Sequence, residues 1–373
     1  MRKKINLIFL SGLVALFLTG AGHSLSDGNE PYKKTVLKLE SGTNNPRNSE
    51  GDFITLKDGR TLFIFSRFTG TDGGDFGHAY LASRYSTDKG KTWSNEDRLV
   101  VTQEAKVNTM SVSLLRLKNG SIALFYLRVN STSDCIPWMR ISTDEAKTWS
   151  EPVQCISDRK GYFVVNNNRV IQLKNGRLLM PAAYHYVPEG GDWNEKAGHG
   201  RIFCYYSDDN GQTWKPSKEV PNPDGVLNQE PAVIELKNGD ILMLIRTNSG
   251  AQYISNSKDK GKTWSAAKKS NIISPTSPAS VARIPSTGDL LLVWNNTVNE
   301  KRTPLNIAVS KNEGKTWSHI KTLEGNPDKG YCYTAIHFTD DKDVLLGYCA
   351  GSQSKGILNE TDIVKLNLEW IYK

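Results

Sequence analysis

Ser86-Thr87-Asp88-Lys89-Gly90-Lys91-Thr92-Trp93 is the first of five copies of an octet, and this repetition decides the fold. Every copy has Ser at its first position, Asp or Asn at its third, and Thr-Trp at its end. The copies start 50 to 65 residues apart, and the other four begin at Ser142, Ser207, Ser257 and Ser310. A period of this length is typical of folds that are built from repeated supersecondary units.

A second pattern alternates with the octets: an apolar residue, a polar turn that contains Gly, and an apolar run. Its first copy is Leu56-Lys57-Asp58-Gly59, and it returns at Leu117, Leu173, Leu236, Ile284 and, in degenerate form, Phe338. Asp-Gly or Asn-Gly between apolar runs indicates a tight β-hairpin. The two kinds of hairpin together give about four strands in each period. The sequence therefore predicts an all-β chain, a six-bladed β-propeller with its sheets arranged radially.

The residue types of the octet fit a structural role in a turn. The Asp carboxylate can accept backbone N–H groups of its own turn, Gly tolerates a positive φ, and Trp fills the apolar gap between sheets. A calcium loop would need alternating acidic ligands and a closing Glu, which the octets lack. Ala146 replaces the Gly of one copy and Asn312 the Asp of another, as a scaffold tolerates. We expect no metal site and no cofactor.

The N-terminus has the three parts of a secretory signal: basic residues 2–4, an apolar run over 5–18 and small residues over 20–22. An uncleaved anchor is the alternative, although the apolar run is short for a stable span. We expect the mature chain to be exported, to a periplasm or outside the cell, without stable membrane insertion. The predicted boundaries are a signal peptide over 1–23, an N-terminal linker over 24–43 and one propeller domain over 44–373.

Composition narrows the functional classes. Of the 373 residues, 38 % are hydrophobic and 23 % are charged, which fits a globular protein rather than a disordered one. The formal charge of +8 is spread along the chain, so nucleic acid is not an expected partner. A monomer is also expected. The cysteines are not spaced as the ligands of a metal site would be. We expect buried free thiols, and one disulfide is the alternative. The five cysteines are Cys135, Cys155, Cys204, Cys332 and Cys349.

The octets resemble the Asp boxes of the sialidase superfamily, whose members are six-bladed propellers, and the resemblance extends from about Asn44 onward. It implies a retaining exo-glycosidase that releases terminal sialic acid, or a related 2-keto sugar acid, from a glycan. Such a substrate carries a carboxylate on its anomeric carbon, which arginine binds well and which would repel an anionic nucleophile. Sialidases use a Tyr nucleophile instead. The family pattern is three Arg, a Tyr with a Glu base, and an acid Asp.

Four residues of the expected blades four to six match this pattern. Glu230 begins a strand and Arg246 ends its hairpin partner, as the base and the second arginine do in the family. Arg302 lies before an octet, in the place of the third arginine. Tyr333 precedes Thr and an apolar run, as the family nucleophile does, and Tyr331 is the alternative. The resemblance thus implies Tyr333 and Glu230 as catalytic residues and both arginines as substrate-binding residues.

Blade one would supply the remaining parts. Arg47 occupies the place of the first arginine, although the Arg-Ile-Pro signature of the family is absent. In the glycine-rich loop after the first hairpin, Asp75 is the implied acid, and Asp72 is the alternative. Arg67, at the start of this loop, is implied to line the site and bind substrate.

Polar residues of blade three could form a rim that faces the sugar: residues 166–169, His185, Glu189, Asp192, Trp193 and His199. A metal site built from the two histidines lacks supporting spacing. Two other functions remain open, a non-catalytic glycan-binding propeller and a propeller glycosidase or lyase that uses carboxylates or His. A Tyr333–Glu230 pair within hydrogen-bond distance would favour the enzyme, because a binding protein has no need of it.

Overall fold

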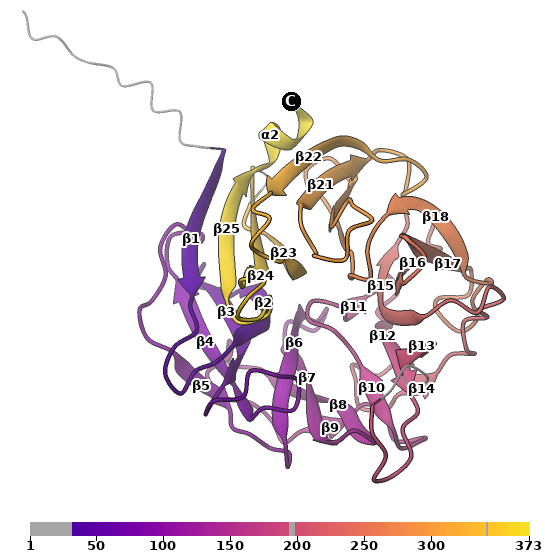
Figure 1. Cartoon of the computed structure of the whole chain (residues 1–373), viewed down its shortest axis with the longest axis horizontal. Coiled ribbons are helices and arrows are strands. Elements are labelled where there is room, and N and C mark those ends of the chain that lie inside the picture. The colour runs from indigo at the N-terminus through magenta and orange to yellow at the C-terminus, as the bar shows by residue number, and fades with distance from the viewer. Residues whose placement is uncertain (1–31, 194–197, 341) are drawn as a thin grey trace, which may run out of the picture. The chain divides into compact units, whose positions relative to one another are not determined.

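The computed structural model describes residues 32–193, 198–340 and 342–373, and this part of the chain is almost entirely β-structure (Figure 1). The described residues form 25 strands and a short C-terminal helix, α2 (Leu368–Tyr372). The prediction of an all-β chain is confirmed. Within the same residues, no helix has the length and apolarity to cross a membrane.

Four of the sheets have four strands each, in antiparallel order. One is β2 (Asn48–Thr55), β3 (Thr61–Phe68), β4 (Ala79–Ser86) and β5 (Arg98–Val101). The next are β15 (Asn228–Glu235), β16 (Ile241–Thr247), β17 (Ala251–Ser257) and β18 (Lys268–Ile273), then β19 (Ser280–Arg283), β20 (Leu290–Trp294), β21 (Leu305–Ser310) and β22 (Ser318–Glu324). The last is β1 (Lys33–Leu39), β25 (Thr361–Asn367), β24 (Asp343–Cys349) and β23 (Cys332–Phe338).

A fifth sheet has nine strands. Its members are β6 (Asn108–Arg116), β7 (Ile122–Ser131), β8 (Asp134–Ser142), β9 (Val153–Gln154), β10 (Tyr162–Val164), β11 (Ile171–Gln172), β12 (Leu178–His185), β13 (Arg201–Ser207) and β14 (Lys215–Pro216). One parallel pair, Tyr162 with Cys135, links β10 to β8. The hydrogen bonds of the described residues therefore define five sheets, whereas the sequence predicted six. Figure 1 shows the sheets following one another around a common centre.

Strand β1 shows that the fold begins before the predicted boundary at residue 44. Residues 33–39 were expected to lie in a linker, but they pair antiparallel with β25 from Lys33↔Leu366 to Leu39↔Thr361. The alternation of Val and Leu with Lys in this stretch suits an outer strand with one buried and one solvated face. The N-terminal strand thus completes a sheet whose other strands are C-terminal. The predicted signal peptide, 1–23, lies outside the described residues.

The octets form turns of the expected kind. In the third copy, Ser207 Oγ accepts a hydrogen bond from the Gly211 backbone N–H at 2.8 Å, and Asp209 Oδ1 accepts one from Thr213 N at 2.9 Å. Gly211 has φ = 89°, and a Cβ at this position would lie 2.4 Å from the Met139 sulfur. Trp214 packs edge-on against Phe125 between neighbouring strands. The octet therefore fixes the turn and fills the gap beside it.

Ser207→Ala should lower the free energy of unfolding by about 1 kcal/mol, because the buried Gly211 N–H loses its acceptor. Denaturant unfolding followed by tryptophan fluorescence would measure this loss. An unchanged unfolding midpoint would contradict the structural role of the octet.

The core consists of apolar clusters between adjacent sheets, rich in Phe, Leu, Ile and Val. All five cysteines are buried and none forms a disulfide, which confirms the expectation of buried free thiols. Cys332 and Cys349 lie directly opposite each other on β23 and β24.

Candidate active site

The same backbone irregularity occurs in four strands near the centre of Figure 1: β2, β6, β15 and β23. In each, the register shifts so that two residues of the inner strand face one residue of its partner. The first residue of each pair has a positive φ: 53° at Glu50, 59° at Ser111, 44° at Glu230 and 56° at Tyr333. A bulge of this kind bends the strand and redirects a side chain, often beside an active site.

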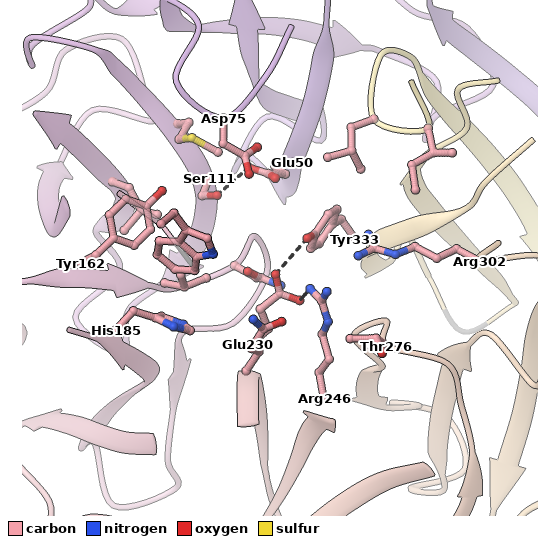
Figure 2. Close-up of a pocket in the computed structure, with 18 of the residues that line it drawn as sticks. Glu50, Asp75, Ser111, Tyr162, His185, Glu230, Arg246, Thr276, Arg302 and Tyr333 are labelled. Atoms are coloured by element: carbon pink, nitrogen blue, oxygen red, sulfur yellow. Dashed lines mark hydrogen bonds and ion pairs between the residues drawn. The ribbon is translucent and has the colours of Figure 1, made fainter. Parts of the chain in front are cut away.

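All four redirected side chains line one cavity of about 660 Å³ (Figure 2). Its polar lining also includes Asp75, His185, Arg246, Glu300 and Arg302, and its apolar lining includes Phe76, Met110, Tyr162 and Trp193. A repeated feature of the strands therefore builds a single site from four sheets. Of the predicted rim residues, Asn166, His185 and Trp193 line this cavity. The ring centroids of His185 and Trp193 are 4.9 Å apart.

The centre of the cavity holds a hydrogen-bonded chain of three side chains (Figure 2). The Tyr333 hydroxyl donates to Glu230 Oε1 at 2.9 Å, and Arg246 Nη1 donates to Glu230 Oε2 at 2.5 Å. Glu230 and Arg246 come together because Gln229 pairs with Arg246 across the β15–β16 hairpin, so the two strand ends meet. The Tyr333–Glu230 contact, by contrast, joins two residues that are 103 positions apart in the sequence.

The charges around Glu230 favour a role as a proton acceptor. Burial raises the pKa of its carboxyl, but Arg246 and Arg302 outweigh burial and hold the pKa below the usual value. Burial raises the pKa of Tyr333 well above its usual value, and the Glu230 carboxylate raises it further. The pair thus rests as a neutral hydroxyl that donates to an ionised carboxylate. This is the starting state for a general base that removes the Tyr proton during an attack.

Arg302 approaches the same centre from another sheet. Its guanidinium carbon lies 5.5 Å from the centroid of the Tyr333 ring, and Nη1 donates to Cys332 Sγ at 3.3 Å. Both Arg246 and Arg302 line the cavity. The structure therefore brings together four of the predicted site residues: Tyr333, Glu230, Arg246 and Arg302.

Arg47 is placed differently from the expectation. Its side chain is only 1 % exposed and is absent from the cavity lining. Nε donates to Ser49 Oγ at 2.7 Å, Nη1 to Asp75 Oδ1 at 2.7 Å, and Nη2 to Glu50 Oε1 at 2.9 Å. The guanidinium is thus engaged by two carboxylates, and it supports the cavity wall from behind. Asp75 itself lines the cavity with a side chain that is 56 % exposed.

The alternatives for acid and nucleophile lie elsewhere. Asp72 Oδ1 accepts the Gly74 backbone N–H at 2.8 Å and does not line the cavity. Tyr331 is buried against Tyr348, and its ring is also absent from the cavity. Of each pair of alternatives, the structure therefore places Asp75 and Tyr333 at the cavity.

Arg67 is not brought to the cavity. It lies on β3, where its Nε donates to Asp97 Oδ2 at 2.8 Å and its guanidinium lies over Tyr80. Arg67→Ala should therefore change the KM for any substrate of this cavity by less than about threefold, the effect of an ordinary surface substitution. Steady-state kinetics would check this. A tenfold rise in KM would mean that Arg67 reaches the substrate.

The sequence analysis did not predict that Glu50 and Ser111 line the cavity, although the spacing within the repeats could have indicated it. Glu50, Ser111 and Glu230 each lie nine residues before the glycine of their hairpin, at Gly59, Gly120 and Gly239. Aligning the repeats on that glycine would have placed all three at one structural position. Tyr333 escapes this rule because the sixth hairpin has no glycine. Among the described residues, no cluster of three or more His, Cys, Asp or Glu has an arrangement that could hold a metal ion.

Comparisons with known proteins agree with this architecture. The family model of the BNR repeat-like domain matches residues 68–346. A sialidase of Clostridium perfringens is 31 % identical over 270 residues, which cover 62 % of this chain and 65 % of that protein. A sialidase of Bacteroides fragilis (strain YCH46) is 26 % identical over 222 residues, which cover 56 % of this chain and 38 % of that protein. The chain thus aligns with only part of these two relatives.

The structural similarity to solved proteins covers more of the chain than the sequence similarity to these two sialidases. The leech intramolecular trans-sialidase superposes with a TM-score of 0.71 at 16 % identity, over 92 % of this chain and 71 % of that one. At this identity the similarity shows a shared fold, and the chemistry has to be argued from the cavity itself.

Proposed function

Because the chain belongs to the BNR repeat-like family, within the sialidase superfamily of Asp-box proteins, we propose that it is a retaining exo-glycosidase for terminal sialic acid or a related 2-keto sugar acid. The observation that carries this proposal is the 2.9 Å hydrogen bond from Tyr333 to Glu230, flanked by Arg246 and Arg302. A glycan-binding protein would gain little from burying such a pair, since burial of a charged carboxylate is unfavourable.

In the proposed reaction, Arg246 and Arg302 bind the substrate carboxylate. Glu230 accepts the Tyr333 proton while the phenol oxygen attacks the anomeric carbon, and Asp75 protonates the departing glycan oxygen. In the second half, Asp75 removes a proton from water, and the water displaces Tyr333. Glu230 then returns the proton to Tyr333, so both carboxylates end as they began. Two displacements at one carbon retain its configuration, and no cofactor takes part.

We extend the proposal to the architecture and the location. The nine-stranded sheet would be two blades, β6–β9 and β10–β14, joined at the Tyr162–Cys135 pair, which would make a six-bladed propeller. The sequence of residues 1–23 supports export through a signal peptide, and the enzyme would act outside the cytoplasm as a monomer on glycans.

A second candidate function follows from Arg47. Because this arginine is occupied by Glu50 and Asp75, the cavity offers two arginines to a carboxylate instead of the expected three. A non-catalytic glycan-binding propeller would tolerate this arrangement.

A fluorogenic α-sialoside distinguishes the two functions. The enzyme should release the fluorophore, and NMR of the first sugar product should show the α-anomer, since the configuration is retained. Tyr333→Phe protein, prepared identically, is the control for contaminating sialidase. Binding of sialosides without hydrolysis of any 2-keto acid glycoside would contradict the enzyme and favour the binding protein.

A further inference from the structure

Three buried asparagines hold the backbone at residues that the proposed reaction uses. They are Asn108, Asn167 and Asn295, each at most 1 % exposed, and none of them lines the cavity. Each side-chain amide donates to two or three backbone carbonyls, at Asp75, Tyr333, Arg302 and their neighbours. Those three residues stand at different places around the cavity (Figure 2).

Asn167 holds the backbone of the proposed nucleophile. Its Nδ2 donates to the carbonyl oxygen of Gly51 at 2.8 Å and to that of Tyr333 at 3.0 Å. Both carbonyls belong to the bulges of β2 and β23, where the shift in register interrupts the pairing with the neighbouring strand. Buried carbonyls need a donor, and this one amide supplies it to both bulges. A residue between β10 and β11 therefore fixes where Tyr333 stands.

Asn108, the first residue of β6, holds the loop of the proposed acid. Its Nδ2 donates to the carbonyl oxygens of Asp75 at 2.8 Å and Gly77 at 3.0 Å, in the connection between β3 and β4. Because the Asp75 side chain is 56 % exposed, packing restrains it little. The position of its backbone therefore decides where the carboxyl group stands in the cavity.

Asn295 follows β20 and holds the turn that contains Arg302. Its Nδ2 donates to the carbonyl oxygens of Arg302 at 2.9 Å, Pro304 at 3.0 Å and Tyr331 at 3.1 Å. Its Oδ1 accepts from Ser277 Oγ at 2.7 Å. Arg302 has φ = 55°, a conformation that residues other than glycine rarely adopt. Such a conformation persists only where the surroundings hold it, and Asn295 supplies this restraint.

Stability alone does not explain these side chains. In Asn108 and Asn167, Oδ1 is buried and accepts no hydrogen bond from any described residue. A buried acceptor without a donor is unfavourable. The amide cannot turn over to expose it, because that would place Oδ1 against two carbonyl oxygens. Each amide is thus locked in the one orientation that holds the backbone beside the cavity.

We propose that these three asparagines are positioning residues, each for a different part of the reaction. Asn108 positions the acid Asp75, Asn167 positions the nucleophile Tyr333, and Asn295 positions Arg302 for the substrate carboxylate. The inference rests on the proposed function for the roles of these partners. A misplacement of about 1 Å at a reacting group can lower the rate by about 100-fold. Removal of each asparagine should therefore impair a different step.

The test replaces each asparagine by Ala and measures binding and turnover separately. Calorimetry, in a Tyr333→Phe background that prevents hydrolysis, gives the Kd of the methyl α-ketoside of N-acetylneuraminic acid. Kinetics without that background compare a 4-nitrophenyl sialoside, whose leaving group departs without protonation, with sialyllactose, whose leaving alcohol needs the acid. Asn306→Ala is the matched control, since its buried amide donates to Lys321 and Thr322 in the outer β21–β22 hairpin.

The three variants should differ in kind. Asn295→Ala should raise Kd and KM at least about fivefold, whereas the other variants should bind within about twofold of the parent. Asn167→Ala should lower kcat at least about tenfold for both substrates. Asn108→Ala should lower kcat/KM at least about tenfold for sialyllactose and less than about threefold for the 4-nitrophenyl sialoside. Asn306→Ala should leave every value within about twofold.

The same loss in all three variants, for both substrates and in proportion to their loss of stability, would show a merely structural role and overturn the inference. Where an alanine variant does not fold, the serine variant, which keeps one donor, replaces it. A position at which neither variant folds is a determinant of folding, and its assignment as a positioning residue is then wrong.

Failure of the proposed function would give a different result. If the Tyr333→Phe protein binds the ketoside but the wild-type protein hydrolyses neither substrate, the enzyme activity and the assignments of Asn108 and Asn167 are wrong. A loss of affinity confined to Asn295→Ala would then keep its assignment to Arg302, and equal affinity would overturn it. Absence of ketoside binding would overturn all three assignments.

Discussion

Tyr333→Phe is expected to lower kcat by about 10³-fold or more. The substitution removes only the hydroxyl that donates to Glu230 and would attack the anomeric carbon. The ring keeps its place beside the Arg302 guanidinium and in its buried pocket. Folding should lose about 1 kcal/mol, the net value of one hydrogen bond. Substrate affinity should stay within about threefold of the wild-type value.

Pre-steady-state kinetics with a fluorogenic sialoside would separate the two effects. The wild-type enzyme should show a covalent step, and the variant should bind the substrate without it. Tyr331→Phe is the matched control, since the Tyr331 ring does not line the cavity. Wild-type kcat in Tyr333→Phe together with loss of activity in Tyr331→Phe would transfer the nucleophile to Tyr331.

Arg246→Ala is expected to remove about 2–5 kcal/mol of transition-state stabilisation, measured as a fall in kcat/KM. KM should rise clearly as well. The arginine would bind the substrate carboxylate, which is present before and during the reaction, so the ground state is weakened too. The same guanidinium donates to Glu230 and is the main positive charge that lowers the pKa of this carboxyl. Its removal should raise the pKa of Glu230.

The pH profile follows from this shift. The base must be ionised, and its ionised form is present above its pKa, so the acid limb of kcat/KM should move to higher pH in Arg246→Ala. Arg246→Lys keeps the charge but loses the planar fork, so its acid limb should move less while KM still rises. An acid limb that is identical in the wild-type and Ala enzymes would show that Glu230 is not the group that titrates.

Much of the fold could be predicted from the sequence, because the turns of the octets and of the glycine hairpins are determined by residues within the turns themselves. A Ser, an Asp and a Gly at fixed offsets determine a turn wherever they occur, as the Ser207–Gly211 contact shows. Strand β1 could not be found this way. It has no turn motif of its own, and it is a strand because β25 offers a partner far along the chain, from Lys33↔Leu366 to Leu39↔Thr361. The contact between β8 and β10 has the same non-local origin.

The candidate site likewise has contacts that the sequence predicts and contacts that it does not. Glu230 and Arg246 belong to one hairpin, so their meeting could be predicted from the sequence. The orientation of Arg47 could not, because it depends on Glu50, at the bulge of β2, and on Asp75 in a following loop. An arginine is drawn to the nearest buried carboxylate, and that partner is set by backbone geometry. Arg67 is likewise held by Asp97, which sequence order gave no reason to expect.

The most direct test of the central claim, that Tyr333 attacks with Glu230 as its base, is to trap the covalent intermediate. A sialic acid derivative with fluoride at C2 and fluorine at C3 should react once and then hydrolyse slowly, because the C3 fluorine destabilises the cationic transition state of both steps while fluoride leaves readily. Mass spectrometry of the protein and its peptides should find one sugar acid on Tyr333, and none in Tyr333→Phe. A sugar on Glu230, Glu50 or any other carboxylate, in an enzyme that hydrolyses sialosides, would contradict the account.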